Sequence, residues 1–150
     1  MASMNIKEKL ENDMKDAMRN KDEERKRTLR MALSEIKLAE IDKGEALDEA
    51  GVIAIIQKEV KSRREAIADA ERASRPDLVA DANTEMAILE TYLPQQLTPE
   101  ELDALAQEAV DETGATSMRE MGQVMKVLMP RLEGRATGQE ASQAVRKLLN

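Results

Sequence analysis

The sequence contains no cysteine and no histidine, and these two absences exclude several kinds of site. Without cysteine there is no disulfide, so a secreted disulfide scaffold has no support. Without histidine the chain lacks Ser-His and Cys-His nucleophilic pairs, His-mediated acid–base catalysis and Cys/His metal sites. The composition does not exclude catalysis by carboxylates or lysines, but no pattern in the sequence marks a catalytic residue, a metal site or a cofactor site, and we expect none.

Aromatic residues are also nearly absent, because Tyr92 is the only one among 150 residues. Ten methionines are present instead, and methionine fills irregular gaps well while specifying geometry poorly. The core is therefore expected to be aliphatic. Sequence-specific RNA binding relies on bases stacked on aromatic rings. If RNA is a partner, its contacts should be to backbone and shape.

Long hydrophobic runs are missing as well. None approaches the ~20 apolar residues that a membrane-spanning helix needs, and the first ten residues lack the apolar core of a signal peptide. We expect no membrane partner and a cytoplasmic location. The net charge of −7 argues against a general nucleic-acid binder.

Apolar residues recur at helical spacing along the chain, and no strand-like alternation with turn residues appears. The sequence therefore predicts an all-α fold, with an N-terminal helical bundle or hairpin over residues 1–94 and a small three-helix tail over 95–150. Within the first part, Gly44 is expected to end a helix and Asp48 to cap the next one.

The tail repeats one helix-start pattern, S/T-x-x-E, in which a hydroxyl and a carboxylate satisfy free backbone N–H groups. It occurs at Thr98–Glu101, Ser117–Glu120 and Thr137–Glu140. These capping boxes predict helices over about 99–112, 118–130 and 138–149, with Pro130 between the last two.

The stretch "MGQVMKVLMPRLEGRATG" raises two questions. A glycine inside a helix costs about 1 kcal/mol relative to alanine, so Gly122 indicates either close helix packing or the approach of a partner's backbone. The loop "GRATG" is first of all a cap, but its arginines adjoin the free N–H groups of a helix start, where anions bind. The methionines around Gly122 are either core filler or a docking face.

Charge is uneven within the tail, because residues 117–150 hold six bases against three acids, a balance of +3. The candidate anion-binding residues are Arg119, Gly122, Lys126, Arg131, Gly134, Arg135 and Gly138. Elsewhere, bases are interleaved with acids and indicate solvated helix faces. Arg63 or Arg64 falls in a gap of an apolar stripe, which marks either an interface or an arginine at the edge of the core.

The segments "ETYLPQQLTPEEL" and "GATSMREMGQVMKVLMPRLEGRATGQEASQAVRKLL" resemble the YqeY-like family, and the resemblance covers nearly the whole chain. It implies an all-α protein whose tail domain is shared with the B subunit of the glutamine-dependent Asn/Gln-tRNA amidotransferase, where it reaches the outer corner of the tRNA. Its motif falls on Gly114, Gly122, Met125, Gly134, Ala136 and Gly138. The family often has Asp where this chain has Thr137, so any role for a carboxylate there would be lost.

Three functions follow as hypotheses. The first is a non-catalytic module that binds tRNA or a tRNA-modifying enzyme complex through the tail. The second is a protein–protein adaptor that uses the Met-rich helical face. The third is the activity that family membership often brings as a label, carbon–nitrogen ligation with glutamine as amido donor. The residues do not support it, since neither a Gly/Ser-rich amidase segment nor a phosphate-binding loop is present.

Overall fold

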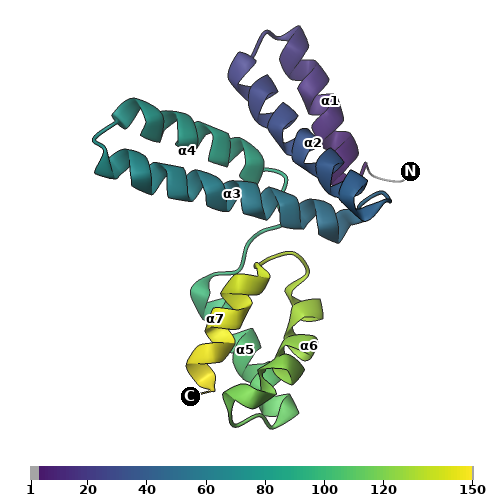
Figure 1. The fold of residues 1–150 in the computed structure, drawn as a ribbon, viewed down its shortest axis with the longest axis vertical. Coiled ribbons are helices and arrows are strands. Elements are labelled where there is room, and N and C mark those ends of the chain that lie inside the picture. Colours follow the sequence, from purple (N-terminus) through teal and green to yellow (C-terminus); the bar gives the residue numbers. More distant parts are fainter. Residues whose placement is uncertain (1–3, 150) are drawn as a thin grey trace. The chain divides into compact units, whose positions relative to one another are not determined.

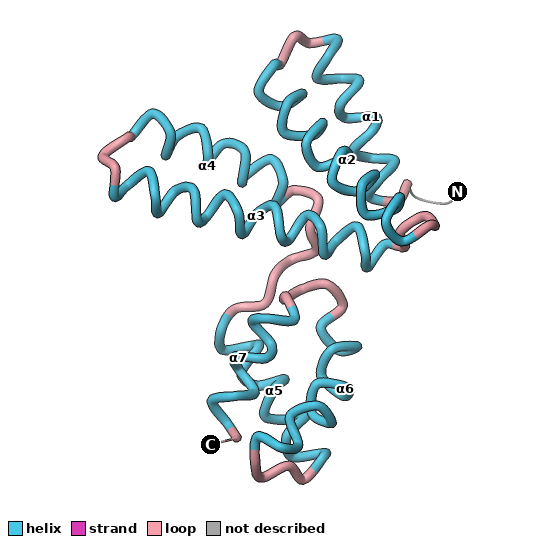
Figure 2. Tube along the Cα trace, in the orientation of Figure 1, coloured by secondary structure: helices cyan, strands magenta, loops and turns pink. Residues whose placement is uncertain are grey.

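The computed structural model describes residues 4–149 and is all-α over that range, as predicted. The chain divides into two compact units, residues 1–93 (unit 1) and 94–150 (unit 2). Figures 1 and 2 show unit 1 as two helical hairpins and unit 2 as a small group of helices. No described helix is long and apolar enough to cross a bilayer.

Unit 1 consists of two helical hairpins that pack on each other through one aliphatic core. Its helices are α1 (Ile6–Arg19), α2 (Glu23–Lys43), α3 (Glu49–Arg72) and α4 (Pro76–Glu90). The core takes the inward stripes of these helices and includes Leu10, Ile36, Ile56 and Leu89, each at most 1% exposed. No single helix buries its apolar stripe alone, so the hairpins are stable only together.

The turn between α2 and α3 follows the sequence prediction. Gly44 ends α2 in the left-handed region at φ +81°, which glycine adopts without a Cβ clash. Asp48 then caps α3 by accepting a hydrogen bond from the N–H of Gly51 at 2.8 Å. The Glu40 carboxylate braces this turn, since it accepts from the backbone N–H of Leu47 and from the Lys7 ammonium, both at 2.9 Å.

The gap in the apolar stripe of α3 is filled by a buried arginine. Arg63 is 7% exposed, and its guanidinium lies 2.7 Å from the Glu59 carboxylate and 3.0 Å from that of Glu85 on α4. Arg64 is exposed. Of the two interpretations of this gap, the structure supports a core-edge arginine, because Arg63 is held inside unit 1 by two carboxylates.

Unit 2 contains α5 (Pro99–Thr113), a 3₁₀ turn η1 (Met118–Glu120), α6 (Met121–Leu132) and α7 (Gly138–Leu148). Their shared core is built largely from small and branched aliphatic side chains, among them Ala106, Val124, Leu128 and Val145, all 0% exposed. The capping boxes at Thr98 and Thr137 are both present, as predicted.

Two predictions for the middle of unit 2 are wrong. Ser117 makes no side-chain cap, and the Glu120 carboxylate instead accepts from the N–H and hydroxyl of Thr116, each at 3.3 Å. Residues 118–120 form the 3₁₀ turn, so α6 begins only at Met121. Pro130 lies inside α6 and not between helices, because the buried Leu132, 2% exposed, holds the last turn in place.

Candidate functional site

The first group of predicted binding residues lies on η1 and the exposed side of α6. Arg119 is in η1, Gly122 and Lys126 lie four apart on α6, and all three are exposed. Neither cation forms an ion pair with any residue in the range 4–149. Two uncompensated positive charges therefore flank a residue that has no side chain.

Packing within unit 2 does not require a glycine at position 122. A Cβ at this position would meet nothing within 4 Å, and the backbone there does not lie at positive φ. The interpretation of Gly122 as a site of close helix–helix approach within unit 2 is therefore wrong. Its other interpretation, that the missing side chain admits a partner, stays a prediction.

The loop arginines are placed differently, because each reaches back to α5 or to the segment before it. The Arg131 guanidinium pairs with the Glu112 carboxylate near the end of α5. Arg135 Nε donates to the carbonyl of Gln95 at 2.8 Å, and its Nη2 lies 3.7 Å from Glu101. Both cations are thus partly neutralised by contacts that hold unit 2 together.

The backbone of the α6–α7 loop is also held from within unit 2. Gly134 takes φ +75°, and its carbonyl accepts from the Gln96 amide at 3.1 Å. The N–H of Leu97 donates to the carbonyl of Arg135 at 2.8 Å. "GRATG" therefore acts as a turn and a helix start, which confirms its prediction as a cap.

The start of α7 is occupied by its own capping box. Thr137 Oγ1 accepts from the N–H of Glu140, and the Glu140 carboxylate accepts from the N–H of Thr137, both at 3.1 Å. Gly138 follows, and a Cβ there would make ordinary contact with Met129 Cε at 3.6 Å. Anion binding at this helix start stays a prediction, and an anion would have to share the site with the Glu140 carboxylate.

The Glu101 carboxylate belongs to a second capping box, at the start of α5. The backbone N–H and the hydroxyl of Thr98 hold the pKa of Glu101 below its usual value, with a smaller contribution from the Arg135 charge. The carboxylate therefore stays ionised at neutral pH. This capping box acts as a fixed negative group beside the loop.

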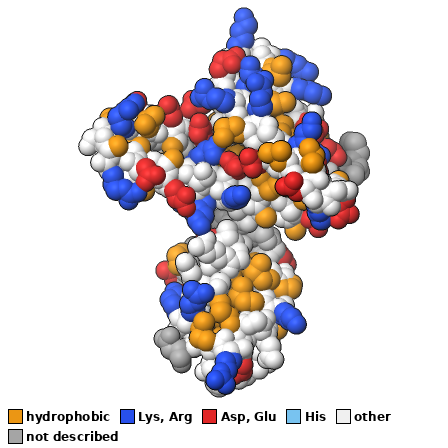
Figure 3. Space-filling view, in the orientation of Figure 1, with side chains coloured by type: hydrophobic (Ala, Val, Ile, Leu, Met, Phe, Trp, Pro, Cys, Tyr) orange, Lys and Arg blue, Asp and Glu red, His pale blue; other side chains and the backbone are white. Residues whose placement is uncertain are grey.

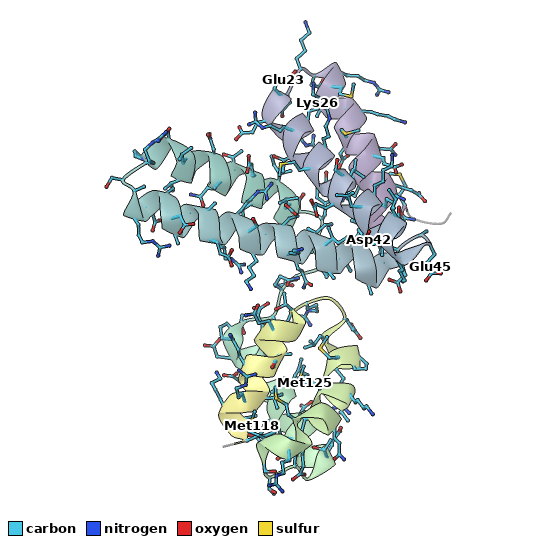
Figure 4. The ribbon with its side chains drawn as sticks, viewed as in Figure 1. Glu23, Lys26, Asp42, Glu45, Met118 and Met125 are labelled. Carbon is cyan, nitrogen blue, oxygen red and sulfur yellow. The ribbon has the colours of Figure 1, made fainter. Side chains whose placement is uncertain are left out.

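The methionines of unit 2 divide into two sets. Met121 and Met125 are partly buried against the core, whereas Met118 and Met129 are 42% and 43% exposed. Figure 3 shows hydrophobic side chains gathered over α6 and α7, with Lys and Arg side chains at the edges of the patch, and Figure 4 labels Met118 and Met125. The face is therefore core filler on its inner side and an exposed apolar surface on its outer side.

Sequence reasoning missed a shallow pocket of about 630 Å³ between the start of α5 and α7. Its lining mixes apolar and charged residues, including Leu102, Ala144 and Arg146. Arg146 is exposed and unpaired among residues 4–149, whereas Lys147 lies 3.3 Å from Asp103. Only the contact between two helices distant in sequence creates this hollow, so no local pattern points to it.

Two further features bear on the chemistry of the described residues. No group of three or more Asp or Glu side chains within residues 4–149 is placed to hold a metal ion. The strongest pKa shift belongs to the Tyr92 phenol in unit 1, where burial is the main cause and the neighbouring Asp13 carboxylate adds to it. The predicted binding residues of unit 2 remain the candidate site.

Comparison with known proteins identifies relatives in yeasts. The chain is 33% identical over 106 residues to altered inheritance of mitochondria protein 41 of Vanderwaltozyma polyspora, a match covering 69% of this chain and 57% of that protein. The protein of the same name is 38% identical over 95 residues in Saccharomyces cerevisiae (63% and 51% covered). In Kluyveromyces lactis it is 42% identical over 84 residues (55% and 45% covered).

These matches span about half the length of each relative. The family described as "Yqey-like protein" matches residues 7–149, which includes both units and every candidate binding residue. That extent agrees with the resemblance seen in the tail motif and in the segment before Pro94. The chain belongs to the YqeY-like protein family.

Proposed function

We propose that this protein is a non-catalytic module that associates with tRNA through unit 2. The observation that carries the proposal is the exposed row Arg119–Gly122–Lys126, in which two unpaired cations flank a position without a side chain. Such a row suits a phosphate backbone, because the cations supply charge and the glycine lets the backbone come close. The resemblance of the tail to that of an amidotransferase B subunit supports the same partner.

The overall charge sets a limit on how this contact works. At −7 the whole molecule repels a polyanion, so the contact has to be local and weak, and stronger binding requires a second component such as an enzyme already bound to tRNA. Arg131 and Arg135 add less than their charge suggests, since carboxylates of α5 lie beside both. Binding is expected to rest mainly on Arg119 and Lys126.

A titration with total tRNA at several salt concentrations tests the proposal. Each phosphate contact contributes about −0.7 to −0.9 to the slope of log K against log salt. Changing both Arg119 and Lys126 to alanine should therefore make that slope shallower by roughly 1.4 to 1.8. Lys58→Ala combined with Arg64→Ala removes the same charge from exposed positions of α3 and serves as the control.

Gly122→Leu tests separately whether tRNA binding needs the missing side chain, because the position is exposed and has room for one. The variant should keep its helical content and lose tRNA affinity. No binding of tRNA at low salt, or an equal loss in the α3 control, would contradict the proposal.

A second candidate, a protein–protein adaptor, is favoured by the exposed Met118 and Met129. Methionine-rich surfaces accept helices of different sequence because the side chain is flexible. Met118→Glu combined with Met129→Glu should abolish retention of a protein partner while leaving tRNA binding in place. The reverse result, with tRNA binding lost and protein retention kept, would rule out the adaptor.

The amide-transferring activity attached to the family is expected to be absent from this chain. Purified protein, assayed for glutamine hydrolysis with and without aminoacylated tRNA, should release no ammonia above background. A cytoplasmic location also stays a proposal, and the mitochondrial names belong to the yeast relatives. Imaging of the tagged full chain in its own cells tests the location.

A further inference from the structure

The outer face of α2 carries apolar side chains that unit 1 leaves largely exposed. Leu38 and Ile41 are 56% and 66% exposed, and Met31 is 45% exposed, although its sulfur accepts from Arg63 Nη2 at 3.6 Å at the edge of this face. Together with Ser34, which is also exposed, they follow the three–four–three spacing of a coiled-coil seam. We call these four residues the α2 seam. The opposite side of α2 holds its buried residues, so the seam faces away from the core of unit 1.

Four charged residues flank the α2 seam, and none has an ion-pair partner in the part of the chain that the structure describes. In heptad terms Met31 and Leu38 occupy a positions, and Ser34 and Ile41 occupy d positions. The flanking g positions then hold Arg30 and Lys37, and the flanking e positions hold Glu35 and Asp42; Asp42 is labelled in Figure 4. All four are exposed, and none forms an ion pair with residues 4–149.

The spacing of these charges points to pairing between helices and not within one. Arg30 and Glu35, like Lys37 and Asp42, are five positions apart, and residues five apart do not meet on a single helix, where partners lie three or four apart. In two parallel helices, however, each g residue faces the following e residue of the other helix. Both g–e pairs of α2 then join opposite charges.

The same pattern argues against the antiparallel arrangement. Two antiparallel helices place g against g and e against e, which would bring Lys37 against its own copy and Glu35 against its own copy. Like charges in such positions repel. The charge pattern therefore selects a parallel partner with this same sequence.

We propose that a second copy of the chain docks in parallel along the α2 seam. A two-fold interface is isologous, so the Arg30–Glu35 and Lys37–Asp42 pairs each form twice around a centre of Met31, Leu38 and Ile41. The seam is short and contains the polar Ser34, so the association depends on concentration. The interface lies in unit 1 and is independent of the tRNA contact proposed for unit 2.

Sedimentation equilibrium of the full chain at low salt tests the dimer. The apparent mass should rise with concentration from 16.7 kDa toward twice that value. Leu38→Glu should remain monomeric throughout, whereas Leu78→Glu, at an exposed leucine of α4, is the matched control and should associate like the parent chain. Circular dichroism should show full helical content in both variants, because both positions are exposed.

Charge reversal tests the parallel register. Lys37→Glu and Asp42→Lys should each weaken association by roughly tenfold, since each turns two attractive pairs into two repulsive ones. An equimolar mixture of the two variants should recover the parent affinity as a heterodimer, because both 37–42 contacts are then attractive.

Three results would overturn the proposal. The parent chain could stay monomeric up to about 1 mM, a concentration at which even weak dimers form. Leu38→Glu could associate as well as the control. The two charge-reversed variants could fail to recover on mixing, which would point to an antiparallel contact or to a different surface.

Discussion

Tyr92 connects the end of unit 1's chain to its first hairpin. Its hydroxyl donates to the Asp13 carboxylate on α1 at 2.5 Å, and Asp13 also lies 3.6 Å from Arg25 on α2. The Lys9 ammonium sits 5.6 Å from the centre of the ring. The residue just before Leu93 and Pro94 is thus fixed to two other helices. This fits the role of an anchor that holds the last residues of unit 1.

Because of these contacts, the free energy of unfolding of unit 1 should change with pH in the alkaline range. Burial, reinforced by the hydrogen bond to Asp13, raises the pKa of Tyr92 to about 12 from an ordinary value of 10.0. The protonated phenol therefore stabilises the fold below pH ~10, and this contribution is lost as the pH rises through ~12. Titration of tyrosinate absorbance should show ionisation near the higher value.

Tyr92→Phe provides the control for this prediction. The urea midpoint of the parent chain should fall more steeply between pH ~10 and ~12 than that of the variant, because both chains share the titration of their lysines. Tyrosinate appearing at its ordinary pKa in the folded protein would contradict the prediction.

Arg63 and Arg64 offer a comparison between neighbouring residues. Arg63→Ala leaves the carboxylates of Glu59 and Glu85 without their cation, and breaking a buried pair in this way costs about 3–5 kcal/mol. Arg64→Ala removes an exposed side chain, so its effect on the free energy of unfolding should stay within about 0.5 kcal/mol. Urea unfolding of both variants checks this. Equal effects would mean that Arg63 is not a structural residue.

At the scale of elements, three identical helix-start patterns have two outcomes. Thr98 and Thr137 cap α5 and α7 as the pattern predicts, whereas Ser117 does not cap α6. The difference arises because Thr116, one residue earlier, binds the Glu120 carboxylate through both its N–H and its hydroxyl. With that carboxylate engaged, the chain turns in a 3₁₀ segment before α6 begins.

The two outcomes predict that alanine substitution lowers stability at Thr137 and not at Ser117. Thr137→Ala removes a hydroxyl that accepts from the N–H of Glu140 and should lower the stability of unit 2 by about 1 kcal/mol. Ser117→Ala removes a hydroxyl that makes no cap, and thermal unfolding followed by circular dichroism should show little change. A comparable loss in both variants would argue that Ser117 caps α6 in solution.

The sequence predicts what is local and periodic, and misses what depends on distant contacts. Stripes, caps and the glycine at Gly44 specify most of the helices, because each depends on residues within a few positions. Pro130 predicts a helix end that the structure does not have, because α6 continues past it to the buried Leu132. The sequence identifies the loop arginines as cations but gives no sign of their carboxylate partners on α5, because that helix lies far away in sequence.

At the scale of the molecule, the two cores share no residue. Unit 1 buries the stripes of α1 to α4, and unit 2 buries those of α5, α6 and α7. Each set of helices therefore covers its own apolar surface. Separate folding of the two units is the physical expectation from this division.

A peptide of residues 94–150 tests this expectation. It should be helical and unfold cooperatively, with modest stability because so small a core buries limited surface. Val124→Asp places a charge at a position that is 0% exposed and should unfold the peptide. A parent peptide with no cooperative transition would show that unit 2 needs unit 1 to fold.

The position of the single tyrosine has a practical consequence for fluorescence experiments on this protein. Its intrinsic fluorescence originates wholly in unit 1, at Tyr92, while unit 2 contains no aromatic side chain and is silent in that signal. A ligand that occupies α6 contacts no fluorescent side chain of unit 2. An engineered tryptophan or an attached dye is therefore needed before binding to unit 2 can be followed directly by fluorescence.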